Sequence, residues 1–421
     1  MTPVDALPSP RHRWKVLAAG VSANAAFATA FSGIPMTAVL MRSGYQLDND
    51  TLGLVLGLMG LGIAVSELPW GLLADRWGDR PVLLLGLGAT AAALIGMALW
   101  AAPTLGHVPG LGWLGTGLLF VGVFGASVNG ASGRAVMRWF SDGERGLAMS
   151  IRQTAVPLGG GVGALLLPAA ALHLGFGAMY GLLAVLCLLG ALLVMAWVHK
   201  PPAAASAPVI SHVHSTQPGG PLRDVRVWRL VGGIGMLCAP QFAVLSFGTV
   251  FLHDFGGIGL GTLSVVMMVV QVGAMVMRVW SGRWTDRRKN RPAYLRTCSV
   301  LTVLLFASLS AAAVLCEGAH AGSPLSHVVL IGLLLVSGVC VSAWHGVAYT
   351  ELATLSGAAR AGTALGMANT VVFMACFISP LAIPRLLTMQ GWPLVWLAAA
   401  GCALLAVPLL APAMRTQGKP R

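Results

Sequence analysis

Long apolar segments alternate with short polar breaks along almost the whole chain. Twelve segments can be separated at charged or Pro/Gly-rich positions, and each approaches the roughly 20 apolar residues that a helix needs to cross a bilayer. They are 15–40, 51–73, 81–101, 112–134, 147–170 and 173–198 in the first half, and 225–251, 260–282, 294–316, 327–350, 361–387 and 391–413 in the second. Because an open strand in lipid would leave backbone groups without partners, the pattern predicts an all-α membrane protein.

The composition supports this prediction. Of the 421 residues, 57% are hydrophobic and only 9% are charged, whereas a soluble domain carries about 25% charged residues. The net charge of +13 would suggest nucleic acid in a soluble protein, but here the basic residues lie at the ends of apolar runs. We therefore expect a lipid bilayer, and no nucleic acid, as partner. The first run, from Trp14 to about Leu40, is too long for the core of a signal peptide and is expected to be retained as a span.

The distribution of basic residues predicts the orientation. Of the 26 Lys and Arg residues, all but Arg42 and Arg385 fall on one side if the segments cross the membrane in turn. The positive-inside rule then places both termini in the cytoplasm. The richness in Ala, Gly, Leu and Arg favours a bacterium of high GC content, and hence a multi-pass protein of the inner membrane.

A Pro/Ala/Ser/Gly stretch interrupts the chain near its middle, and we interpret it as a linker. The predicted parts are a cytoplasmic tail 1–14, a six-helix bundle 15–198, a cytoplasmic linker 199–224, a second six-helix bundle 225–413 and a tail 414–421. His212 and His214 lie in the linker without further ligands nearby, and the seven cysteines have no metal-ligand spacing. We expect no metal, no cofactor and no catalytic residues.

The two halves share a motif. Segment GLLADRWGDR begins at Gly71, and GRWTDRRKNR begins at Gly282. Gly71 and Gly282 are separated by the same number of positions as Asp75 and Asp286. Internal repeats of this kind are typical of secondary transporters.

The first copy resembles the signature loop G-x-L-a-D-R-x-G-R-R/K of the major facilitator superfamily, with Asp79 where a basic residue is common. The resemblance covers essentially the whole chain. It implies two six-helix bundles related by a pseudo-twofold axis, alternating access to a central site, and a monomer.

The signature loop also suggests a conformational latch. Gly71 and Gly78 would permit an abrupt turn, while Arg76 and Arg80 would hold it at the anionic cytoplasmic surface. We expect Asp75 to pair with Arg134, and the family implies that Asp75 also faces the start of span 11 near Gly362. By the repeat, Asp286 would face the start of span 5 near Gly146. The predicted latch residues are Gly71, Asp75, Arg76, Gly78, Arg80, Arg134, Gly282, Asp286 and Arg287.

Polar residues inside spans are costly and are therefore candidates for a binding site. In this superfamily spans 1, 4, 7 and 10 line the central cavity. The candidates for substrate binding are Asn24, Asn129, Arg152, Gln153, Gln241, Gln271, Trp344, His345 and Asn369. Asn and Gln often only bond between helices, and Arg152 has the alternative of reaching the cytoplasmic surface.

The substrate prediction depends on Arg152. A permanent cation in the cavity suits a carboxylate or another anion, so we predict a small organic anion as substrate. Carboxylates able to carry a coupling proton are scarce: Glu67 and Glu351 are expected near cytoplasmic ends of spans, and Asp254 and Glu317 near periplasmic ends. Glu67, Glu351 and His345 are the candidates for proton coupling.

The sequence thus predicts a secondary active transporter, ion-coupled, for a small organic solute. The alternative is multidrug or metabolite efflux by proton antiport. Pro157, Gly160 and Gly161 partly match an antiporter element, but spans 1 and 4 contain no acid. A membrane-embedded enzyme is disfavoured because no Ser/His pair, nucleotide loop or intramembrane metal cluster is present, and no further domain supports a sensor.

Overall fold

The computed structural model describes residues 11–104, 106–140, 148–149, 151–199, 221–316, 323–357 and 361–410. Within these ranges the chain is helical apart from short connections and one isolated bridge between Thr104 and His107. The prediction of an all-α fold is confirmed. The sites proposed near Gly146, His212, His214 and Glu317 lie outside the described residues.

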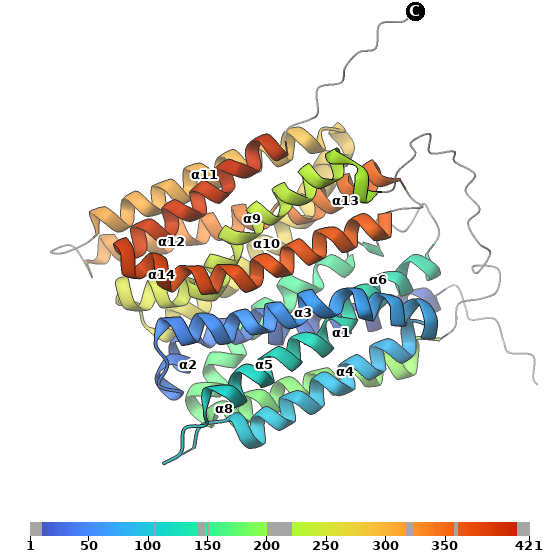
Figure 1. Ribbon diagram of the computed structural model, residues 1–421, viewed down its shortest axis with the longest axis horizontal. Helices are drawn as coiled ribbons and strands as arrows, with labels where there is room; N and C mark the ends of the chain where they lie inside the picture. The colour runs from blue at the N-terminus through green and yellow to red at the C-terminus, as the bar shows by residue number, and fades with distance from the viewer. Residues whose placement is uncertain are drawn as a thin grey trace, which may run out of the picture.

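The first half of the chain, called the N-half (residues 11–199), and the second, called the C-half (residues 221–410), each form a layer of long, roughly parallel helices in Figure 1. The N-half contains α1 (His12–Gly33), η1 (Ile34–Thr37), α2 (Ala38–Gly44), α3 (Asn49–Trp77), α4 (Asp79–Gly96), η2 (Met97–Ala101), α5 (Leu111–Gly125), α6 (Ser127–Trp139) and α8 (Ala155–Trp197). The C-half contains η4 (Pro221–Arg223), α9 (Val225–Val250), η5 (Phe251–Phe255), α10 (Leu260–Arg288), α11 (Arg291–Leu315), α12 (Pro324–Ser342), α13 (His345–Ser356) and α14 (Ala361–Leu409).

Ten helical stretches of the described chain are long and apolar enough to cross a membrane. Two of them, Ile151–Trp197 and Gly362–Leu409, have 47 and 48 residues, and a helix of that length spans about 70 Å, more than twice the hydrocarbon thickness. Each contains a non-helical kink, at Gly175 in α8 and at Gln390 and Gly391 in α14. The prediction of twelve crossings stays a prediction, with these kinks as the places where two pairs of predicted spans meet.

Polar caps and glycine fix the ends of the helices. The Asp48 carboxylate accepts a hydrogen bond from the Thr51 backbone N–H at 2.8 Å and begins α3, while Asp224 accepts one from the Arg226 N–H and begins α9. Gly78 ends α3 with φ +93°, a conformation that side chains other than glycine rarely adopt. The turn predicted at Gly71 is wrong, because α3 continues helically through that residue to Trp77. Gly282 likewise lies inside α10.

The halves pack tightly along α3 and α14. A Cβ atom on Gly53 would lie 2.2 Å from the Pro380 carbonyl oxygen, and one on Gly57 would lie 2.9 Å from the Phe377 oxygen. Glycine therefore allows the two backbones to touch, as small residues do between membrane helices. This seam places the first turns of α3 directly against the C-half.

We call the end of the bundle where α1 begins and α8 ends the terminal end, because His12 contacts the Trp197 carbonyl oxygen there at 2.9 Å. The other end, where α2 lies in Figure 1, is called the far end.

Candidate functional site

Glu67 of α3 joins the two halves. Its carboxylate accepts a hydrogen bond from the Asn369 amide of α14 at 3.0 Å and a longer one from the Asn129 amide of α6 at 3.5 Å. The expectation that Glu67 lies near the end of its span is wrong: α3 continues for ten residues beyond it, about 15 Å of helix. Glu67 is therefore an acid within the bundle and not a surface group.

Arg152 lies beside Glu67 in the N-half. Its guanidinium donates to the Asn129 carbonyl oxygen at 2.5 Å and to the Ser132 hydroxyl at 3.0 Å, both on α6. The residue is 6% exposed, so it does not extend to the membrane surface. It lies near enough to Glu67 for electrostatic attraction, but the two side chains form no ion pair within 4.0 Å.

A second buried arginine approaches from the C-half. Arg278 of α10 is 8% exposed, and its guanidinium donates to the Gln153 carbonyl oxygen at 3.4 Å. Arg152 and Gln153 are consecutive, so Arg278 contacts the N-half at the residue that follows Arg152. Among the described residues, neither arginine has an acid within ion-pairing distance.

An aromatic wall stands next to these charges. The rings of Trp344 and His345 stack with centroids 3.8 Å apart, and Tyr349 lies one helical turn further, 6.1 Å from His345. The Tyr349 hydroxyl donates to the Asn369 side-chain oxygen at 2.7 Å. This links the wall to Glu67 through one amide.

Several buried polar atoms in the C-half lack a hydrogen-bond partner among the residues that the structure describes. They are Gln241 Oε1, Arg278 Nε, Trp344 Nε1 and His345 Nδ1. Buried polar groups of folded proteins are nearly always hydrogen-bonded. Those of Trp344, His345 and Arg278 lie close together, because the Trp344 and His345 rings stack and His345 is within electrostatic reach of Arg278. These three unsatisfied atoms are therefore suited to a polar ligand.

The remaining candidates are distributed differently. Gln271 of α10 packs against Gly160 of α8. A Cβ atom on Gly160 would lie 2.3 Å from the side-chain amide nitrogen of Gln271. Asn24 of α1 is buried. We call Glu67, Arg152, Arg278, Trp344, His345 and Tyr349 the central group. Glu351 lies 3.9 Å from Arg291 and is 26% exposed, so it belongs to a surface ion pair and not to the central group.

The signature loop forms an ion-pair cluster within the N-half. Arg134 binds Asp75, as the sequence predicts, and also Asp79 at 2.5 Å. Arg138 lies 3.6 Å from the second oxygen of Asp79. Asp79, which departs from the family motif, is thus the buried centre of the cluster, whereas Asp75 is 73% exposed. The cluster fixes α3, α4 and α6 at the terminal end.

Other loop residues make local contacts or face outward. Arg80 donates to the Met195 carbonyl oxygen at 2.8 Å, and Arg76 and Arg287 are exposed. Asp286 pairs with Arg291 at 2.7 Å inside the C-half. The contact predicted between Asp286 and Gly146 involves a residue outside the described ranges.

An ion pair joins the halves at the far end. Arg42 of α2 binds both carboxylate oxygens of Asp254 of η5. Asn49 accepts from Arg42 at 3.2 Å, and the His253 ring contacts Asp254 at 3.0 Å. In the described ranges this is the one ion pair between the N-half and the C-half. It explains why Arg42 departs from the positive-inside pattern.

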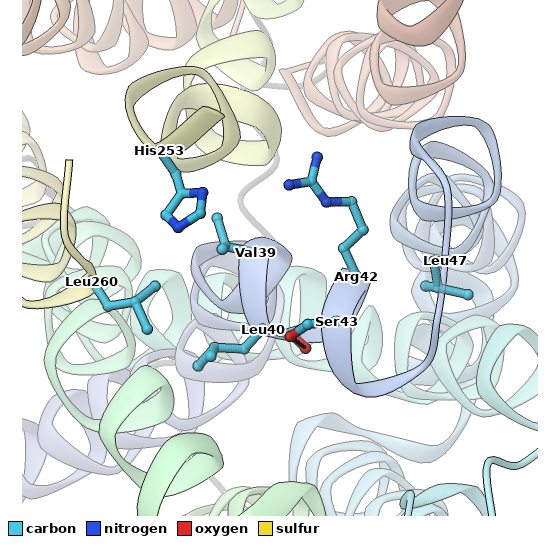
Figure 2. A pocket seen from close by; sticks show the side chains of 7 residues that line it. All are labelled: Val39, Leu40, Arg42, Ser43, Leu47, His253 and Leu260. Carbon is cyan, nitrogen blue, oxygen red and sulfur yellow. Dashed lines mark hydrogen bonds between the residues drawn. The ribbon is translucent and has the colours of Figure 1, made fainter. Parts of the chain in front are cut away.

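A pocket of about 370 Å³ opens beside this pair. Figure 2 shows Arg42 and His253 on its two sides, with Val39, Leu40 and Ser43 of α2 between them. The pocket is small and lies at the far end, so we assign the central group, and not this pocket, as the candidate binding site.

Two members of the central group are not among the candidates that the sequence predicts. Arg278 was counted among the topology-setting basic residues, although its place inside the predicted span 260–282 was a signal for burial. Tyr349 carried no signal, because a tyrosine near the end of a span is common at membrane interfaces.

Comparisons with known proteins agree with this architecture. The family model described as Major Facilitator Superfamily matches residues 20–380. An uncharacterised MFS-type transporter of Mycobacterium tuberculosis strain H37Rv is 28% identical over 404 residues, which cover 94% of this chain and 84% of that protein. Its counterpart in strain CDC 1551 matches equally over 404 residues.

Two solved structures have the same fold. A bacterial homolog of the human lysosomal transporter Spinster, in an inward-facing and occupied conformation, superposes with a TM-score of 0.71 at 15% identity, covering 96% of this chain and 97% of that one. Its inward-facing and unoccupied form gives a TM-score of 0.69 at 15% identity, covering 96% and 95%.

Proposed function

Because the chain belongs to the major facilitator superfamily, we propose that it is a secondary active transporter that carries a small organic anion across the membrane by alternating access. The division into bundles 15–198 and 225–413 gives the two parts that move. The proposal includes a monomer in the bacterial inner membrane with both termini in the cytoplasm. The terminal end of the bundle is then the cytoplasmic end.

The proposal rests on Arg152 and Arg278, two buried arginines that have no acid within ion-pairing distance among the described residues. A buried charge without an ion-pair partner costs several kcal/mol. Arg278 has none among the described residues and Arg152 has only the more distant Glu67, so an anion that binds near both arginines reduces this cost. With Glu67 ionised and His345 neutral, the central group carries one net positive charge, which a monoanion would neutralise. Arginine also presents a planar fork that fits a carboxylate in two-point contact.

Glu67 supplies a means of ion coupling. It competes with the substrate for the positive field of Arg152, so protonation of Glu67 strengthens anion binding. By reciprocity, anion binding favours protonation to the same degree. Within the described ranges, the charged or titratable groups that interact with Glu67 are Arg152 and Tyr349. This arrangement favours symport of a proton with the anion.

The substrate proposal is tested by transport in proteoliposomes. Uptake is measured for a panel of small monocarboxylates, with the matching neutral amides as competitors. Loss of a hydrogen bond to a charged group costs about 1.5–3 kcal/mol, so Arg152→Gln and Arg278→Gln should each reduce affinity by about 10- to 100-fold. The exposed Arg287→Gln is the matched control. Unchanged transport in both buried variants, or equal competition by the amides, would refute the proposal.

The coupling proposal has a separate readout. Glu67→Gln should still exchange anion across the membrane but should no longer accumulate it when an inward proton gradient is applied. Accumulation that persists in this variant would exclude Glu67 as the coupling site. Measuring flux in both directions distinguishes uptake from the efflux alternative.

A further inference from the structure

Three phenylalanines from three helices meet in the interior between the two halves. Phe31 of α1 lies with its ring centroid 5.6 Å from Phe242 of α9 and 5.7 Å from Phe373 of α14. Phe31 belongs to the N-half and the other two to the C-half. We call these three residues the phenylalanine cluster.

The cluster adjoins the candidate binding site. Phe373 lies one helical turn beyond Asn369, whose amide binds Glu67. Phe242 follows Gln241, whose buried side-chain oxygen has no partner among the described residues. Along α14, Phe373 is followed by the segment that packs on the first turns of α3. The cluster therefore lies on the far side of the charged group.

The rings of the cluster are not fully covered. All three residues have intermediate exposure, although Phe31 of the N-half packs against both Phe242 and Phe373 of the C-half. Their chain neighbours Ala30 and Val372 are 0% and 5% exposed. These partly exposed aromatic residues, one of them a helical turn from the Asn369 that binds Glu67, add an apolar part to the charged candidate site.

Building on the proposed function, we infer that the transported anion is amphipathic: its carboxylate binds between Arg152 and Arg278, and a flat apolar group of about one aromatic ring lies against Phe31, Phe242 and Phe373. Aromatic rings gain from burial and from edge or offset contacts with other rings. A small polar acid would leave the phenylalanine faces in contact with water, and would bind more weakly for that reason.

A series of acids tests the inference in the purified full-length protein. Binding of acetate, propionate, hexanoate, benzoate and 3-phenylpropionate is measured by isothermal calorimetry or by competition. Each buried methylene should improve affinity about fourfold, so 3-phenylpropionate should bind at least 30-fold more tightly than acetate.

Variants of the cluster separate its role from that of the charges. Phe242→Ala should lower the preference for 3-phenylpropionate over acetate by about tenfold. Phe31→Leu keeps most of the side-chain volume and should reduce the preference for the phenyl acids over hexanoate. Phe120→Ala is the control, because Phe120 of α5 is 45% exposed on the outside of the bundle. Thermal unfolding and gel filtration verify the fold of each variant.

The outcomes separate two failures. If no acid binds and Arg152→Gln has no effect, both the proposed function and the inference are overturned. If the acids bind in an Arg152-dependent manner but acetate binds as tightly as 3-phenylpropionate, or if Phe242→Ala and Phe31→Leu keep the wild-type preference, only the amphipathic substrate is overturned.

Discussion

The ion pair between Arg42 and Asp254 gives a direct test of alternating access, because its members come from opposite halves. The side chains are 24% and 27% exposed and share two hydrogen bonds. Exposed pairs contribute up to about 1 kcal/mol, and breaking a buried pair costs about 3–5 kcal/mol. For this intermediate case we take about 2 kcal/mol as the order of magnitude.

This energy acts entirely on the conformational equilibrium. In the proposed alternating-access cycle the pair exists only while the far end is closed, so its loss favours the state in which that end is open. A change of about 2 kcal/mol corresponds to about 30-fold in the ratio of the two states. Asp254→Asn or Arg42→Gln should therefore raise the open population about 30-fold, as long as that state remains minor.

Labelling of a cysteine at Val39 measures the open population. Val39 lines the pocket beside the pair and is 8% exposed, so Val39→Cys reacts slowly with a membrane-impermeant maleimide while the far end is closed. The parent protein corrects for the seven native cysteines. Both single variants should label about 30-fold faster, and the charge exchange Arg42→Asp with Asp254→Arg should return the rate towards wild type. The proposed role of the ion pair in closing the far end would be refuted by either of two results. One is labelling of both single variants at rates within twofold of wild type, and the other is a charge-exchange variant that labels no more slowly than the single variants.

Three further predictions concern packing and the signature loop. Gly53→Ala places a methyl 2.2 Å from a carbonyl of α14 and should destabilise the protein by about 1–3 kcal/mol in thermal unfolding, whereas Gly71→Ala, with nothing within 4 Å of its Cβ, should not. Asp79→Asn removes the buried partner of two arginines and should cost about 3 kcal/mol; Asp286→Asn, at a site 61% exposed, should cost under about 1 kcal/mol. Asp75→Asn should change the balance between the open states and the transport rate, and a wild-type distribution of states in site-directed labelling would count against the latch.

The fold could be predicted from sequence because the membrane restricts the chain to helices, and helices of that length require long apolar segments. The boundaries between consecutive helices are not restricted in this way, and they were predicted less well. Segments 147–170 and 173–198 are separated only by Ala171 and Leu172 in the sequence, and the structure continues the helix between them with a kink at Gly175. By contrast, the predicted break before 391 coincides with the kink at Gln390 and Gly391.

Depth within the bundle was the main source of error at the site. A helix can continue past the membrane surface. The number of residues between a side chain and the next charged residue in the sequence therefore does not give the depth of that side chain in the bundle. Glu67 and Arg278 each have ten helical residues between them and the end of their helix. Both were therefore assigned to the surface from sequence, although the residues that they meet, Gln153 and Asn369, were already candidates.

Substrate binding must act on the same equilibrium as the far-end ion pair. An anion held by Arg152 of the N-half and Arg278 of the C-half, as proposed, adds attraction between the halves on the terminal-end side of the phenylalanine cluster. It therefore favours closure of that end, which requires separation of Arg42 from Asp254 at the other. One charged hydrogen bond contributes about 1.5–3 kcal/mol, comparable with the about 2 kcal/mol estimated for the pair, so two can drive the change. A saturating phenyl acid should then accelerate Val39→Cys labelling in an otherwise wild-type protein and have no effect in Arg278→Gln. Slower labelling with the acid would show that the anion binds more tightly to the state that is closed at the far end. The proposed coupling, in which anion binding separates Arg42 from Asp254, would then be wrong.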